Sequence, residues 1–290
     1  MNFRTLAAAA LLFVAAPLWA DDKDEALAKQ RESAAAKWKK MAFEKSPPVV
    51  ETANFLVHAR LPETKTKALA SALDRQFPVM LKALKYEGED RPWPGKLQVF
   101  VFAERSEFTD FMRKALKKPV KEDDSTFFSF EAEDSVLVIG APRGGAKTDP
   151  EAEAKHQLAT AVLARKMGSG EPPDWVALGF GEAAAYRAAN PKATGKNPAW
   201  KPPGLPLAAL WTEGVPAAAR AKYAAYVIDY MAFGPLAEHF PTFIASLRPD
   251  ETGTVAGIDE ALKAINLDQL SLEYAARNWI KPKPPAKPKK

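Results

Sequence analysis

The chain changes from strand-like to helix-like patterning near residue 149, and this change constrains its fold more than any other feature. Before it, Phe55, Val57 and Ala59 alternate with their neighbours, and residues 96–102 form a largely apolar run. Both patterns predict buried strands. After it, apolar residues recur at the steps of three and four that are typical of amphipathic helices. The sequence therefore predicts an α+β fold, in which a small N-terminal sheet with its helices is followed by a helical half.

Two further elements belong to the predicted sheet half. Apolar residues recur at helical spacing between Leu69 and Leu84, and Pro78 should kink this helix because proline removes a backbone donor. Residues 127–130 and 136–139 flank a short acidic segment, which predicts a β-hairpin.

A long helix is expected to begin at Asp149 and Pro150, because aspartate caps helices and proline favours the first helical position. Every later segment with a periodic pattern also predicts a helix. The predicted domain covers residues 49–280, with the sheet half over 49–147 and the helical half over 148–280.

The first 20 residues have the layout of a secretory signal peptide. A positive charge at Arg4 precedes an apolar run over residues 6–18, and Ala20 stands before the acidic Asp21. The run is shorter than the ~20 apolar residues that a helix needs to span a bilayer. We predict cleavage after Ala20 and export to the periplasm or the medium. A retained membrane anchor is the alternative interpretation.

Two polar segments flank the predicted domain. Residues 21–48 are charged and rich in alanine, which predicts an exposed helix or leader that ends at Pro47 and Pro48. Residues 281–290 contain only lysine, proline and alanine. We expect them to form a disordered, extended tail that weakly attracts anionic envelope polymers.

The net charge of +5 does not indicate a nucleic-acid partner. Arg4 and the lysines of the tail supply this excess, so the body of the chain between them is nearly neutral. Nucleic-acid binding normally needs a basic face on the folded domain. The chain has no cysteine, which excludes disulfides and thiolate chemistry, so packing alone must stabilise the fold.

Two segments of the helical half carry a specific pattern. One is His156-Gln157-Leu158-Ala159-Thr160, and the other, residues 172–182, reads Pro-Pro-Asp-Trp-Val-Ala-Leu-Gly-Phe-Gly-Glu. They resemble the HExxH helix and the Pro-Pro-x-Trp-Leu-x-Glu-Gly-x-Ala-Glu-Tyr segment of gluzincin zinc metallopeptidases, in particular the exported bacterial peptidase MA-like proteins. The resemblance extends from about Phe55 to Trp279. It implies a thermolysin-like catalytic-domain architecture with a cleft between the two halves.

The same resemblance implies that the catalytic site is vestigial. In active members, two histidines and a glutamate from the next helix bind zinc, and the glutamate beside the first histidine activates water. Of these four positions only His156 is retained, since Gln157, Thr160 and Leu178 occupy the others. Glutamine cannot act as the general base, a role worth ~10²- to 10⁴-fold in rate. We therefore expect no catalytic residues, and no metal or other cofactor.

A rearranged metal site is the alternative. Glu153 and His156 lie three positions apart on one predicted helix, and Glu182 follows Leu178 by one turn on the next. Two carboxylates and an imidazole could then hold zinc in a metal-dependent hydrolase. The simpler interpretation places Glu153 in the first, dipole-favoured turn of its helix and pairs Glu182 with a nearby cation such as Arg187.

The other histidines, His58 and His239, have no neighbours at ligand spacing, so we expect ordinary surface or capping positions for both. The preferred function is that of a catalytically inactive exported peptidase-like domain that binds or assembles with a protein or peptide partner. The resemblance implies a mechanism, since such peptidases hold substrates along an edge strand: capture of an extended peptide along residues 136–139, interpreted as that strand. The sequence names neither this partner nor an oligomeric state. A purely structural envelope protein is a further alternative.

Overall fold

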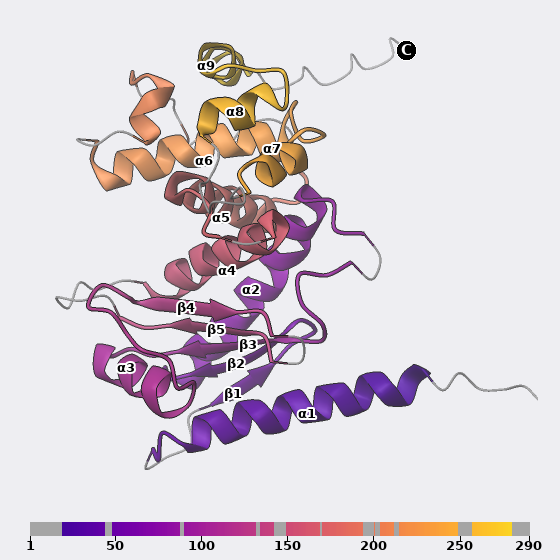
Figure 1. Ribbon diagram of the computed structural model, residues 1–290, viewed down its shortest axis with the longest axis vertical. Helices are drawn as coiled ribbons and strands as arrows, with labels where there is room; N and C mark the ends of the chain where they lie inside the picture. The colour runs from indigo at the N-terminus through magenta and orange to yellow at the C-terminus, as the bar shows by residue number, and fades with distance from the viewer. Residues whose placement is uncertain are drawn as a thin grey trace, which may run out of the picture.

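A mixed sheet with the strand order β1-β2-β3-β5-β4 forms the framework of the N-terminal half (Figure 1). Strands β2, β3 and β5 run parallel, whereas β1 and β4 pair antiparallel at the two edges. The strands are β1 (Val49–Glu51), β2 (Phe55–Ala59), β3 (Leu97–Val101), β4 (Thr126–Ser129) and β5 (Val136–Ile139).

This computed structural model describes residues 19–43, 48–87, 90–131, 134–141, 149–168, 170–193, 200, 204–211, 215–248 and 257–279. The predicted signal peptide up to residue 18 and the predicted tail 281–290 lie outside the described residues. Within them, no helix is both long and apolar enough to cross a membrane. The prediction of an α+β fold is confirmed.

The hairpin of β4 and β5 is confirmed, but the interpretation of β5 as an edge strand is wrong. Strand β5 lies between β3 and β4, and β4 forms the edge. The burial of the two strands explains this arrangement. All four residues of β5 are buried, as suits a continuous apolar strand inside a sheet, whereas every residue of β4 is partly exposed.

Helices cover both faces of the sheet. Phe55 and Val57 of β2 face a core that includes α2 (Glu63–Ala83) and α4 (Pro150–Met167). Leu56, between them, faces a second core with α1 (Trp19–Lys39) and α3 (Arg105–Lys114). Figure 1 shows α1 and α3 on the side of the sheet nearest the viewer. Coverage on both sides explains why every residue of β2 and β3 is buried.

The leader predicted over residues 21–48 is not exposed along its whole length, which corrects that expectation. Its helix α1 presents Gln30, Ala34 and Trp38 to the sheet at four-residue spacing, and all three are buried. Residues at this spacing share one face of a helix. The Trp38 ring lies 5.8 Å from that of Phe100 and 5.3 Å from that of Phe102, measured between centroids.

Helix α2 is continuous across Pro78. The proline has no N–H to donate to the carbonyl of Asp74, but it lies on the exposed side of the helix, where water can replace this bond. At the start of α4, Asp149 caps the helix as predicted, because its carboxylate accepts a hydrogen bond of 3.0 Å from the Glu151 N–H.

The helical half stacks on α4 (Figure 1). Helix α5 packs against both α4 and α6, and Gly179 and Gly181 permit the two close approaches. Helix α7 begins at Phe240, and Pro241 lies in its first turn, where proline is favoured. The elements are α5 (Asp174–Ala189), the 3₁₀ helix η2 (Leu207–Leu210), α6 (Ala217–Phe233), α7 (Phe240–Ser246), α8 (Ile258–Lys263) and α9 (Gln269–Arg277).

Candidate functional site

The two segments that carry the peptidase-like pattern lie on α4 and α5, which pack side by side. They approach closely at Gly181, where an added Cβ atom would lie 3.2 Å from the Cα atom of His156. A small residue at this position lets the two backbones meet. His156 and the segment that follows Leu178 are therefore neighbours in space.

A small open pocket of about 80 Å³ lies between the two helices. His156 and Leu178 both line it, so the structure brings together two of the residues that the sequence pattern singled out. Glu182 lines the same pocket, one turn beyond Leu178. The complete lining is Ala152, Lys155, His156, Leu178, Gly181, Glu182 and Ala185.

Gln157 and Thr160 are not among the residues that line this pocket. Gln157 Nε2 donates a hydrogen bond of 2.9 Å to Glu153 Oε1, one turn earlier on α4. Thr160 Oγ1 donates to the His156 carbonyl at 3.2 Å, a common contact of helical threonines with their own backbone. Both side chains thus satisfy polar groups of α4 itself.

The residues of the alternative metal site are only partly brought together. His156 and Glu182 both line the pocket, whereas the carboxylate of Glu153 accepts a hydrogen bond from Gln157. In the part of the chain that the structure describes, no group of three His, Asp or Glu residues is placed to hold a metal ion. A catalytic zinc needs three protein ligands, so this alternative requires Glu153 to exchange its contact with Gln157.

Arg187, the cation expected to pair with Glu182, is directed into the contact between α5 and α6. Its Nε and NH2 groups donate to the two carboxylate oxygens of Asp229 at 2.7 and 2.8 Å. Asp229 is fully buried, and the Arg187 side chain is only 10% exposed. Glu182, in contrast, is exposed at the rim of the pocket.

The polar groups of the pocket are few. Lys155 forms an ion pair of 2.5 Å with Glu151, which leaves His156 and Glu182 as the polar groups that face an apolar Leu178. A single imidazole and an exposed carboxylate can still orient a small polar group.

The open edge of the sheet at this end belongs to β4, not to the predicted residues 136–139. Among the described strands, β4 pairs with β5 alone. The Gly140 N–H donates to the Ser125 carbonyl at 2.8 Å, which makes this pair hydrogen-bonded. Because antiparallel pairs alternate, the main-chain groups of Thr126 and Phe128 point away from β5. Such an edge can accept a further strand.

The two remaining histidines differ. His239 occupies the N-cap position of α7 and is exposed, as predicted. His58 is only 4% exposed and stacks on Phe100 with 5.0 Å between the ring centroids, so the prediction of a surface position is wrong. Burial, reinforced by the charge of Lys37, lowers the pKa of His58 from 6.5 to about 4.

Comparison of the chain with protein-family models and with curated protein sequences gave no match. The likeness to gluzincin peptidases therefore depends on the residues of α4 and α5 and on the order of the elements.

Proposed function

We propose that this chain is a non-catalytic, exported domain with a gluzincin-type architecture, and that it binds an extended peptide. The observation that carries this proposal is the open edge of β4. The partly exposed Phe127 and Phe128 project to opposite faces of that edge, one beside each core. A peptide that adds a strand there would gain main-chain hydrogen bonds, and its side chains would contact these two rings.

The pocket between α4 and α5 supports the non-catalytic part of the proposal. Its histidine has lost the partners that would hold zinc, and Gln157 is engaged by Glu153. In this account, the helices keep the peptidase-like packing while the chemistry is absent. The metal-dependent hydrolase stays the alternative, since His156 and Glu182 face the same pocket.

The edge can be tested with one substitution that changes its main chain. Thr126→Pro removes an N–H that points away from β5, so the bonds between β4 and β5 remain. Thr126→Val is the matched control, because it keeps the N–H and suits a strand. Extended peptides are selected from a displayed random library on wild-type protein, and their dissociation constants are measured by fluorescence anisotropy.

We expect Thr126→Pro to weaken binding of the selected peptides by about fivefold, because a lost hydrogen bond costs about 1 kcal/mol. Thr126→Val should bind them as wild type does. Equal affinity of wild type, Thr126→Pro and Thr126→Val for these peptides would show that they do not bind at the edge of β4.

A further inference from the structure

Helix α1 is held on the sheet by few apolar contacts. In its described part, Ala34 and Trp38 are the buried apolar side chains, and the other two buried residues, Gln30 and Lys37, are polar. Hydrogen bonds and ion pairs exchange with water when such a helix leaves its site, so they add little net stability. The docking of α1 therefore depends on a narrow apolar stripe.

One polar cluster ties the middle of α1 to the sheet. Lys37 Nζ donates to Ser33 Oγ at 2.7 Å, to the fully buried Gln98 at 3.2 Å, and to the carboxylate of Asp134. Burial would raise the pKa of Asp134, but hydrogen bonds from Lys37, Gln98 and Ser33 outweigh it, so this pKa is lowered. The carboxylate thus keeps its charge in mild acid.

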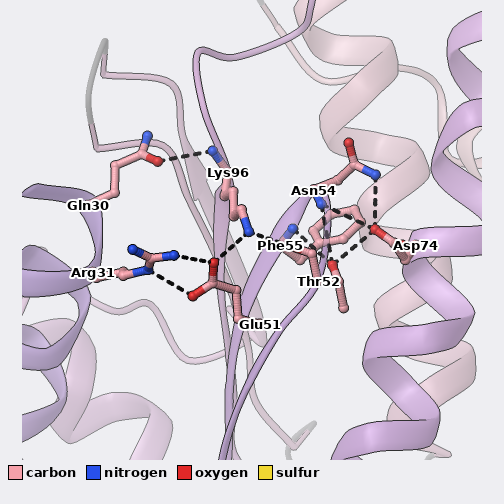
Figure 2. Close-up of polar contacts among 8 residues, drawn as sticks. All are labelled: Gln30, Arg31, Glu51, Thr52, Asn54, Phe55, Asp74 and Lys96. Atoms are coloured by element: carbon pink, nitrogen blue, oxygen red, sulfur yellow. Dashed lines mark hydrogen bonds and ion pairs between the residues drawn. The ribbon is translucent and has the colours of Figure 1, made fainter. Parts of the chain in front are cut away.

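A second cluster holds the same helix at the edge of the sheet (Figure 2). Arg31 donates to both carboxylate oxygens of Glu51, at 2.8 and 2.7 Å, and Lys96 Nζ lies 2.6 Å from Glu51 Oε1. Gln30 Oε1 accepts the Lys96 N–H at 3.0 Å. The hydrogen bond from Arg31 chiefly lowers the pKa of Glu51 to about 2, so this pair also persists in mild acid.

His58 lies under this helix without a matching partner. Its ring is 5.6 Å from that of Trp38, and neither His58 Nδ1 nor Trp38 Nε1 has a hydrogen-bond partner among the described residues. Two buried polar atoms without partners weaken the contact between α1 and the sheet. A proton added to this imidazole would place a second positive charge beside Lys37 in a buried interface.

The groups around His58 do not offset that charge. Its neighbours on the sheet are the apolar Val49 of β1 and Phe100 of β3. From α1 the charged group is Lys37, which opposes protonation. Arg60, which directly follows β2, forms an ion pair of 2.9 Å with Glu107 of α3.

We propose that α1 is an acid-released cover of this face of the sheet, and that protonation of His58 drives its release. The neutral imidazole belongs to the docked state. Its pKa is about 4 when buried and 6.5 when solvated, so docking is at full strength above pH 6.5 and weakens as the pH falls to about 4. Within this window the release equilibrium rises by up to about tenfold per pH unit.

Release is measurable because the natural chain has no cysteine. Ala34→Cys places a thiol on the buried stripe of α1, and Ala35→Cys places one on the exposed side of the same helix. The ratio of their reaction rates with 4,4′-dithiodipyridine removes the intrinsic pH dependence of thiol chemistry. Val162→Cys, fully buried in α4, reports on opening of the main core.

Between pH 7.5 and 4.5 we expect the rate of Ala34→Cys relative to Ala35→Cys to rise by at least about tenfold. The rate of Val162→Cys relative to Ala35→Cys should stay constant. Adding His58→Gln or His58→Phe, neither of which titrates, should abolish the rise. The proposal is overturned by a constant ratio for Ala34→Cys, by a rise that persists in both His58 variants, or by a parallel rise for Val162→Cys.

Discussion

Gly179 of α5 packs directly against the Ala224 carbonyl group of α6, since an added Cβ atom would lie 2.6 Å from that oxygen. This contact joins residues 172–182, the second segment with the peptidase-like pattern, to α6. Overpacking costs about 1–3 kcal/mol, which exceeds the helix-propensity gain of about 1 kcal/mol that alanine offers over glycine. We expect Gly179→Ala to lower the free energy of unfolding in urea. Gly204→Ala is the control, because no atom lies within 4 Å of its added Cβ. Equal stability of the two variants would contradict this packing.

A second prediction concerns the buried ion pair of Arg187 and Asp229. Removal of one partner leaves an uncompensated buried charge, so Asp229→Ala should lower the free energy of unfolding by about 3–5 kcal/mol. The matched control is Glu63→Gln, which breaks the exposed pair of Glu63 and Lys67 and should leave stability within error. Denaturant titration measures both. If the free energy of unfolding falls by the same amount in both variants, the ion pair of Asp229 with Arg187 does not hold α5 on α6.

The hydrogen-bond register of β4 gives a third prediction. Phe127→Pro removes an N–H that points toward β5, whereas Thr126→Pro removes one that points away from it. We expect the first variant to melt well below wild type and the second to melt near it. Differential scanning calorimetry distinguishes them. A larger loss for Thr126→Pro would show that the alternation along β4 is the reverse.

Glu51 should make stability depend on pH. Its pKa is lowered from 4.5 to about 2, chiefly by the hydrogen bond from Arg31. The ionised carboxylate therefore contributes its full stabilisation above pH 4.5, and this contribution is lost as the pH falls toward 2. Wild type should exceed Glu51→Gln in stability at pH 6, and the difference should shrink from pH 4.5 downwards. A difference that stays constant from pH 6 to pH 3 would assign the effect to packing.

The strands and helices could largely be predicted, because their apolar periodicities are local. The place of β5 inside the sheet also had a local signal. Its four apolar residues suit a strand that is buried on both faces, whereas β4 has a polar residue at each end, Thr126 and Ser129. The continuity of α2 through Pro78 depends instead on which side of the helix faces solvent. That side is fixed by packing against the sheet.

The docking of α1 was missed because its buried stripe is mostly small or polar. Ala34 and Trp38 lie four residues apart, but a single large apolar side chain gives little periodic signal. Once α1 covers the sheet, the burial of His58 follows from its position two residues after Leu56, on the same face of β2. In the candidate site, the spacing along two helices was enough to bring His156 near Leu178, whereas the contact of Glu153 with Gln157 depends on side-chain rotamers.

The zinc content of the purified protein tests the central claim most directly. A zinc site needs three protein ligands, and the pocket offers His156 with the exposed Glu182. Wild-type protein should carry much less than one zinc per chain by mass spectrometry of its metals. If wild-type protein instead retains one zinc per chain and loses it on His156→Ala or Glu182→Ala, the site is not vestigial and the non-catalytic account is contradicted.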